Sequence, residues 1–122
     1  MSSSVRFQSF DLLATLVAVV QRNGCILFAN AALEDALGSS RRTIEGSQLA
    51  QCFTDSQAME TALKGADGHE FAALRYDAWL KRLGFEPLPV HVIVTPTDAS
   101  NAAGEIIIEL LPLEQQAKQD RE

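Results

Sequence analysis

Residues 16–37 read LVAVVQRNGCILFANAALEDAL and combine three signals of local structure in one short stretch. An apolar run ends just before Asn23-Gly24, a strong signal for a tight hairpin turn because both residues tolerate the positive φ of a type I′ turn. A second apolar run covers residues 25–29, and Asn30 then suits the N-cap of an amphipathic helix over residues 31–37. The stretch predicts two paired strands that lead directly into a short helix.

The composition is that of one globular domain without a membrane span. The chain has 122 residues, of which 47% are apolar, and no apolar run approaches the roughly 20 residues of a membrane helix. It has only two cysteines and no signal-peptide pattern, so we expect a reducing, cytoplasmic location. The net charge of −6, without a basic patch, argues against nucleic acid as a partner.

The middle of the chain predicts short helical pieces. Ser39 and Ser40 can cap a turn that runs to Ile44, and Ser47 can cap a second piece over residues 48–53. Thr54 and Gln57 have the spacing of a capping box, which predicts a helix over residues 55–64. The glycine-containing segment 65–68 is expected to end it.

From His69 onward the apolar period changes to two, which predicts strands. The alternation is clearest at residues 90–94 and 105–111, with a polar loop at 96–104 between them. The segment Glu86-Pro87-Leu88-Pro89 should lie at a strand entrance or an exposed edge, because proline cannot donate a ladder hydrogen bond.

The strands at residues 16–20 and 105–111 carry apolar side chains on both faces, as strands do in a sheet that is covered on both sides. We expect the helices of residues 31–64 on one side. The amphipathic segment from Val5 to Thr15, or a second subunit, should cover the other side. The order of strands and helices indicates an α+β fold with a five-stranded antiparallel sheet.

The junction Phe28-Ala29-Asn30-Ala31-Ala32, followed by Leu37-Gly38, resembles the start of a PAS sensor domain. The order of predicted elements over residues 16–113 is similar to the PAS fold, with short helices on one sheet face and an N-terminal helix on the other. Residues 76–88 depart from the compact PAS pattern, so the strand register there stays open.

A finer likeness is to the sensor domain of the nitrogen-regulation histidine kinase family NtrB. It rests on residues 10–13, on residues 28–32, and on residues 106–113 with the following Glu114-Gln115-Gln116. The resemblance implies a homodimer in a cytoplasmic two-component kinase, with a PII-type signal protein and a response regulator as partners. It also implies three parts: a dimerising helix over residues 1–15, the PAS domain over 16–113, and the start of a helical linker over 114–122.

No catalytic residue can be assigned in this sequence. The phosphoacceptor pattern His-Glu-x-x-Asn-Pro is absent, and neither His69 nor His91 lies in a helix where a haem ligand is expected. We interpret both histidines as surface residues of strands. Cys25 and Cys52 lack metal-ligand spacing. Flavin-binding PAS domains carry a photoactive cysteine at the position that corresponds to Leu49, three residues before Cys52. We therefore expect no enzyme activity in this chain, no metal and no cofactor.

Two groups of residues are the candidate sites. A ligand pocket between helices and sheet, if it is open, would be lined by apolar side chains; the alternative is that they simply fill a closed core. Its members are Phe28, Leu33, Leu37, Leu49, Phe53, Met59, Phe71, Val92 and Ile108. The expected dimer interface consists of Val5, Phe7, Phe10, Leu13 and Val17. Tyr76 and Trp79 are further candidates for a partner surface.

Overall fold

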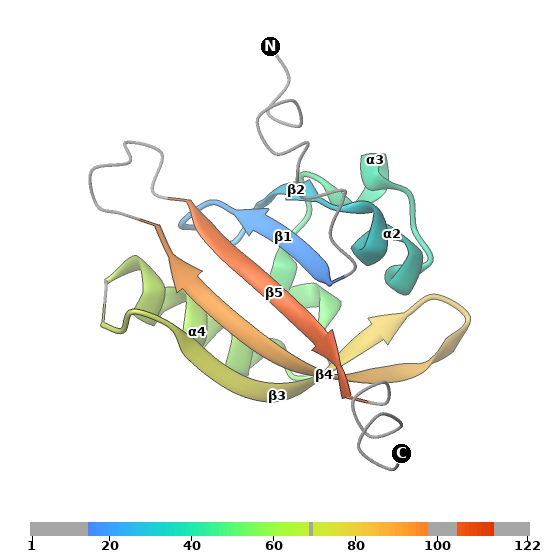
Figure 1. The fold of residues 1–122 in the computed structure, drawn as a ribbon. Helices are drawn as coiled ribbons and strands as arrows, with labels where there is room; N and C mark the ends of the chain where they lie inside the picture. Colours follow the sequence, from blue (N-terminus) through green and yellow to red (C-terminus); the bar gives the residue numbers. More distant parts are fainter. Residues whose placement is uncertain (1–14, 69, 98–104, 114–122) are drawn as a thin grey trace.

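In the computed structural model the chain folds into a five-stranded antiparallel sheet with helices on one face (Figure 1). The structure describes residues 15–68, 70–97 and 105–113. The α+β class and the five-stranded sheet are as predicted. The N-terminal segment Val5 to Leu13, His69 and the expected linker from residue 114 lie outside the described residues. The elements, in chain order, are β1 (Leu16–Val20), β2 (Ile26–Ala29), α2 (Ala31–Leu37), α3 (Arg41–Ile44), the 3₁₀ helix η2 (Leu49–Cys52), α4 (Ser56–Asp67), β3 (Leu74–Arg82), β4 (Phe85–Pro96) and β5 (Ile106–Pro112).

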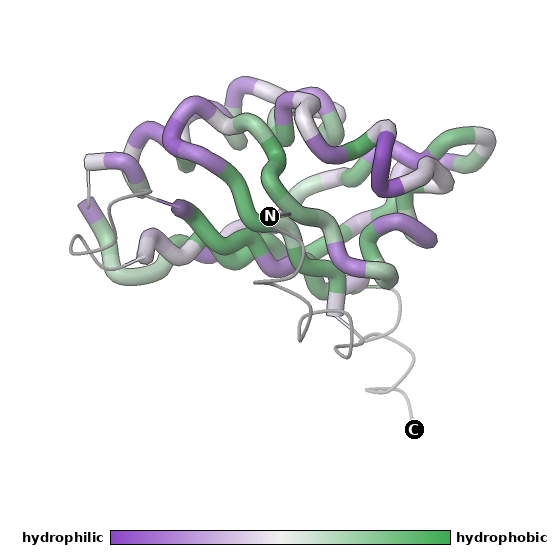
Figure 2. The backbone as a smooth tube through the Cα atoms, turned by 90° about the horizontal axis from the view of Figure 1, so that it is seen from above, coloured by the Kyte–Doolittle hydropathy of each residue, from purple (hydrophilic) through white to green (hydrophobic). Residues whose placement is uncertain are grey.

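The strands lie in the order β2-β1-β5-β4-β3, so the last strand of the chain occupies the middle of the sheet. β5 pairs with β1 from Leu16 opposite Leu110 to Val20 opposite Ile106, and with β4 from Val90 opposite Pro112 onward. In Figure 2 the tube is coloured as hydrophobic along much of these strands, as expected for strands covered on both faces.

The first hairpin forms where it was predicted, but with a longer loop. The Gly24 amide donates to the Gln21 carbonyl at 2.8 Å, and the Gln21 amide donates to the Cys25 carbonyl at 2.9 Å. Gly24 has a φ of 88°. These bonds enclose three loop residues, with a glycine of positive φ in the third position, so the predicted two-residue Asn23-Gly24 turn of type I′ is wrong.

The helix starts are partly as predicted. Asn30 caps α2 through the Leu33 amide, Gly38 ends that helix in a left-handed conformation, and Ser40 caps α3. Ser47 does not cap η2, because its hydroxyl donates back to the Ile44 carbonyl.

Helix α4 begins and ends differently from the prediction. Asp55, rather than Thr54, is the N-cap and accepts from the Ala58 amide at 3.2 Å. The helix continues through Gly65 to Asp67, and Gly65 lies on its buried face, where an added Cβ atom would meet the ring of Phe71. The helix thus ends within the predicted segment 65–68, with Gly68 as its C-cap, although later than the predicted last residue, Lys64.

β3 and β4 form a hairpin that extends past the end of β5. Residues 74–80 of β3 pair in continuous register with β4 down to Leu88, and after a bulge Arg82 pairs with Phe85. Residues 85–89 of β4 pair with β3 alone, since the β5 ladder begins at Val90. Pro87 and Pro89 therefore lie at a strand start with one free edge, as predicted, and the open register of residues 76–88 resolves into this overhanging hairpin.

Candidate functional site

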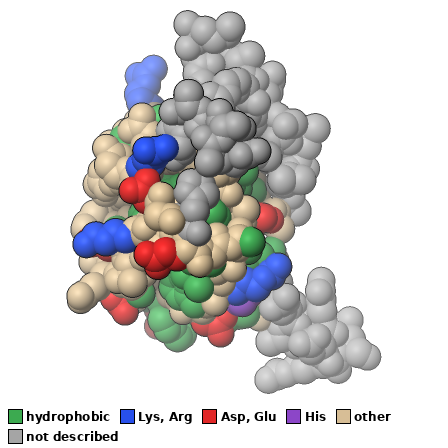
Figure 3. Space-filling model, turned by 90° about the vertical axis from the view of Figure 1, so that its left-hand side faces the viewer, with side chains coloured by type: hydrophobic (Ala, Val, Ile, Leu, Met, Phe, Trp, Pro, Cys, Tyr) green, Lys and Arg blue, Asp and Glu red, His purple; other side chains and the backbone are tan. Residues whose placement is uncertain are grey.

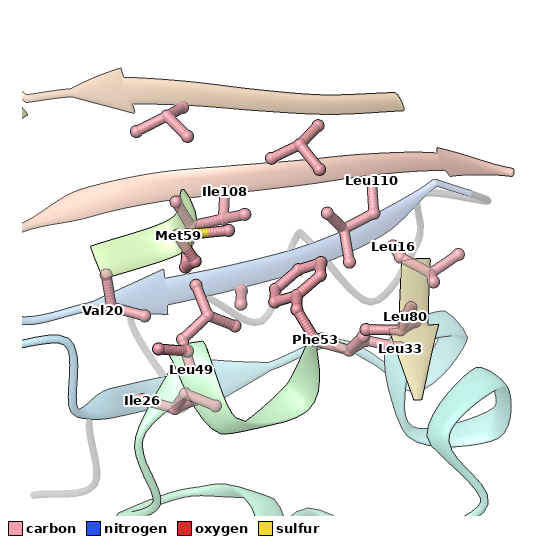
Figure 4. Close-up of a cluster of buried hydrophobic side chains, with 14 of the residues drawn as sticks. Leu16, Val20, Ile26, Leu33, Leu49, Phe53, Met59, Leu80, Ile108 and Leu110 are labelled. Atoms are coloured by element: carbon pink, nitrogen blue, oxygen red, sulfur yellow. The ribbon is translucent and has the colours of Figure 1, made fainter. Parts of the chain in front are cut away.

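The space between the helices and the sheet is filled by apolar side chains. Seven of the nine predicted pocket residues belong to one buried cluster, each at most 8% exposed. They are Leu33, Leu37, Leu49, Phe53, Met59, Val92 and Ile108. Figure 4 shows Leu33, Leu49, Phe53, Met59 and Ile108 pointing toward one another from α2, η2, α4 and β5. The arrangement is that of a packed core.

The other two predicted pocket residues lie elsewhere. Phe71 is half-buried at the margin of the cluster. Phe28 is fully buried, but it packs with Val19 in a separate cluster. A β-bulge causes the difference, because the register of β1 against β2 shifts between Val19, opposite Phe28, and Val20, opposite Ile26. Ile26 therefore faces the main core while Phe28 does not, although simple alternation places both on one face.

Asn30 is the buried polar residue at the centre of the N-terminal half. Its side-chain oxygen accepts from the amides of Val17 and Leu33, each at 3.0 Å, and its amide nitrogen donates to the Thr15 carbonyl at 2.8 Å. The side chain thus joins the start of β1 to the start of α2. The buried side-chain amide of Asn30 therefore has a structural role.

The outer face of the sheet carries a mixed set of side chains. Val17 and Val19 are each 1% exposed within one chain. Ile93, Ile107 and Leu111 are half-buried. Of the predicted dimer residues, Val17 is on this face but has no free surface in the single chain, and the other four lie outside the described residues.

His91 lies on the outer face beside an acidic partner, in agreement with its interpretation as a residue of the sheet surface. Its Nδ1 is 2.9 Å from Oδ1 of Asp77, the residue opposite it in β3. Among the described residues, no three His, Cys, Asp or Glu side chains gather closely enough to hold a metal ion.

The two cysteines are separate and half-buried. Burial raises the pKa of the Cys52 thiol, and the nearby ammonium group of Lys81 lowers it by less. A thiol with a raised pKa is protonated at neutral pH and is a weak nucleophile. Cys52 therefore suits a packing role better than a nucleophilic one.

A surface groove of ≈ 460 Å³ lies between α4 and β3, next to the packed core. Phe71, Leu74 and Tyr76 line one side of it, and Ala62 and Gly65 of α4 line the other. The Tyr76 hydroxyl is 3.7 Å from the sulfur of Met59. Burial, with a smaller contribution from the Asp55 carboxylate, raises the pKa of Tyr76 to about 12. The groove is therefore an apolar surface depression next to a core residue.

Three large apolar side chains are exposed around the end of the β3–β4 hairpin. Trp79, Leu83 and Phe85 are 54%, 70% and 74% exposed. Only Trp79 was singled out from the sequence, and its partner in that prediction, Tyr76, faces the interior. The tip residues were missed because the length of the two strands, which puts residues 83 and 85 at a turn, was not visible in the alternation pattern.

One side of the molecule shows how its charged side chains are distributed. On the side of the molecule in Figure 3, Lys and Arg side chains lie apart, between acidic and apolar ones. Within residues 15–68, 70–97 and 105–113, no helix has the length and apolar composition needed to cross a membrane.

No protein-family model matches the sequence, and no curated protein matches it either. Solved structures do resemble it. A PAS domain of an HTR-like protein from Haloarcula marismortui superimposes with a TM-score of 0.74 at 16% identity, over 90% of this chain and 91% of that one. The chain has a PAS fold. A domain of a sensory box sensor histidine kinase/response regulator from Geobacter sulfurreducens has a TM-score of 0.68 at 16% identity, over 91% and 99% of the two chains.

A third similar structure is that of a receptor domain in a complex. The PAS domain of the RpfR quorum-sensing receptor from Cronobacter turicensis, in complex with BDSF, has a TM-score of 0.68 at 12% identity, over 83% of this chain and 95% of that one. At these identities the similarity establishes the PAS fold of this chain.

Proposed function

We propose that this PAS domain is the sensory and dimerisation module of a two-component histidine kinase of the nitrogen-regulation type. Support for a kinase comes from the fold that the chain shares with the Geobacter sulfurreducens domain. Support for the nitrogen-regulation family is the sequence likeness at residues 10–13, 28–32 and 106–116. In this proposal a PII-type protein and a response regulator are the partners of the whole kinase, and residues 114–122 begin the helical linker.

The observation that carries the proposal is the contrast between the two sheet faces. The inner face is packed against helices with apolar side chains that are almost fully buried. The outer face keeps half-buried apolar side chains on adjacent central strands, at Ile93, Ile107 and Leu111. Such a face can pack against a second copy, and a change in that packing can bias a two-state kinase without any chemistry in the PAS domain.

Association of the chain tests the relay mechanism. Sedimentation velocity over a range of concentrations should show a reversible dimer, weakened by Leu111→Arg, which places a charge on the outer face. Leu83→Arg is the matched control, since Leu83 is 70% exposed at the hairpin tip and not on that face. A chain that stays monomeric at all concentrations contradicts the mechanism, and so does an equal effect of both variants.

The kinase family is tested separately. The reading frame after Glu122 should encode His-Glu-x-x-Asn-Pro roughly one helix downstream, and the kinase should bind a PII-type protein in pull-down assays. A downstream output domain of another kind would contradict the kinase assignment while leaving the dimerisation result intact.

A second candidate is a small-molecule receptor, favoured by the RpfR structure and by the apolar groove beside Tyr76. Native mass spectrometry of the purified chain distinguishes the two. Bound mass that disappears on denaturation would favour the receptor, and a protein of bare mass would favour the closed relay.

A further inference from the structure

A second groove, here called the hairpin-tip groove, lies between α3, η2 and the tip of the β3–β4 hairpin, outside the packed core. Its volume is ≈ 420 Å³. One part of its wall is apolar, formed by the exposed Leu83 and by the edges of Leu37 and Ile44, which are otherwise buried in the core. The half-buried thiol of Cys52 also lines the groove. The remaining lining residues are polar or cationic: Ser39, Thr43, Ser47, Gln51, Lys81 and Arg82.

The charge of this groove is opposite to the charge of the chain. Lys81 and Arg82 both line it, and no Asp or Glu does, although the chain has 16 acidic residues against 10 basic ones. Lys81 is close enough to Cys52 to lower the pKa of its thiol. An anion in the groove would therefore meet two cations and no carboxylate on the wall.

The tip that carries these cations is fixed to the rest of the domain. The Leu83 amide donates to the Leu37 carbonyl at 3.0 Å, at the end of α2. Arg82 donates from Nε to the Glu86 carbonyl at 2.7 Å, and its guanidinium lies 5.7 Å from the centre of the Phe85 ring. These contacts hold the backbone of the tip and the Arg82 side chain in position before any ligand arrives, which lowers the entropic cost of binding at Arg82.

We propose that the hairpin-tip groove binds a small amphipathic anion, with a carboxylate or phosphate head and a short apolar tail. The head lies near Lys81 and Arg82, with the Gln51 amide as a further donor, and the tail covers Leu37, Ile44 and Leu83. Burial of Leu83, which is 70% exposed, supplies a hydrophobic contribution that a bare inorganic anion lacks. The volume suits a compact ligand, since it is near the lower end of the range for small-molecule pockets.

Titrations of the whole ¹⁵N-labelled chain test this proposal with four probes that share or lack each half of the ligand. Octanoate and octyl phosphate carry both head and tail, n-octanol has the tail alone, and inorganic phosphate has the head alone. We expect the first two to shift the amide signals of Thr43, Cys52 and Leu83 saturably, with n-octanol and inorganic phosphate at least about tenfold weaker. Whichever of octanoate and octyl phosphate binds more tightly identifies the head group.

Two variants and a control separate charge from apolar contact. Lys81→Gln should weaken octanoate binding about tenfold, and Leu83→Ser should weaken it by a similar factor. Lys64→Gln removes an exposed lysine of α4 that does not line this groove and should change nothing. Thermal unfolding of each variant verifies that it is folded.

Several results would overturn the proposal. They are the absence of a saturable shift up to about 10 mM of either amphipathic anion, equal affinity for n-octanol, and equal loss of affinity in the Lys64→Gln control. Shifts at Met59 and Ile108 in place of the groove residues would also reject it and would support the receptor function with a ligand in the core. The dimerisation proposal is independent of all these outcomes.

Discussion

At the residue scale, Asn30 determines how the N-terminal half holds together. Replacing it with alanine removes the α2 cap and leaves the Val17 amide without its acceptor. We expect Asn30→Ala to lower the free energy of unfolding by about 2–4 kcal/mol, because a lost cap and an unpaired buried donor both contribute. Urea denaturation measures the change.

The matched control is Asp55→Ala, which removes an exposed cap of α4 and should cost only about 1 kcal/mol. Equal costs for the two variants would mean that the bonds of Asn30 to β1 add nothing to stability.

Gly65 and Phe71 form a second pair with a testable coupling. A methyl group at Gly65 would lie 2.8 Å from the ring of Phe71, which is too close. Alanine at a helix interior normally gains about 1 kcal/mol over glycine, and here overpacking should turn this into a loss of about 1 kcal/mol. In a Phe71→Ala background the same Gly65→Ala change should stabilise the protein. A urea-denaturation cycle with no coupling between the two changes would contradict this contact.

At the scale of single elements, the sequence predicted those whose determinants are local. Helix α2 runs from Ala31 to Leu37 as expected, because Asn30 and Gly38 both have the chemistry of helix ends. The bulge between β1 and β2 was not predictable, since nothing in residues 25–29 marks which residue lacks a partner. That one missing pairing explains why Phe28 was predicted among the pocket residues, although it lies in a cluster separate from the main core.

The end of the β3–β4 hairpin was not predicted either, and the reason is again physical. How far β3 and β4 continue past the end of β5 depends on their pairing with each other. The prolines at 87 and 89 indicate only that no strand pairs with β4 through the amides of these two residues. The hairpin-tip groove could therefore not be predicted from the sequence, because its lining residues come together only in the folded hairpin.

Tyr76 of β3 gives the hairpin a measurable pH response. Its folded pKa of about 12 is above the ordinary tyrosine pKa of about 10, so the unfolded chain loses the phenolic proton first as pH rises. The stabilisation from the protonated hydroxyl is complete below pH 10 and is lost between about pH 10 and 12. Because the chain has one tyrosine, and Trp79 does not ionise, the rise in near-ultraviolet absorbance on tyrosinate formation reports the Tyr76 hydroxyl.

We expect a titration midpoint near 12 in the folded protein, and a flatter alkaline stability profile in Tyr76→Phe. A midpoint near 10 while the protein is still folded would show that the hydroxyl is in free contact with water.

At the scale of the whole molecule, core and outer face should respond differently to substitution. Met59 is fully buried, so Met59→Ala should cost about 2–5 kcal/mol and leave association of the folded chain unchanged. Leu111→Arg should do the reverse, with a small change in the urea midpoint and a large change in the sedimentation profile. If a core variant that is still folded weakens the proposed self-association, the two faces are coupled more tightly than the packing suggests.

The pairing of Leu16 with Leu110 determines where the chain enters and leaves the sheet. The first strand begins beside the point where the last strand ends, on adjacent strands of the sheet. The polypeptide thus comes in and goes out through neighbouring positions. A shift of β5 along β1 would move Leu113 relative to Thr15, and the backbone hydrogen bonds between these two strands oppose such a shift.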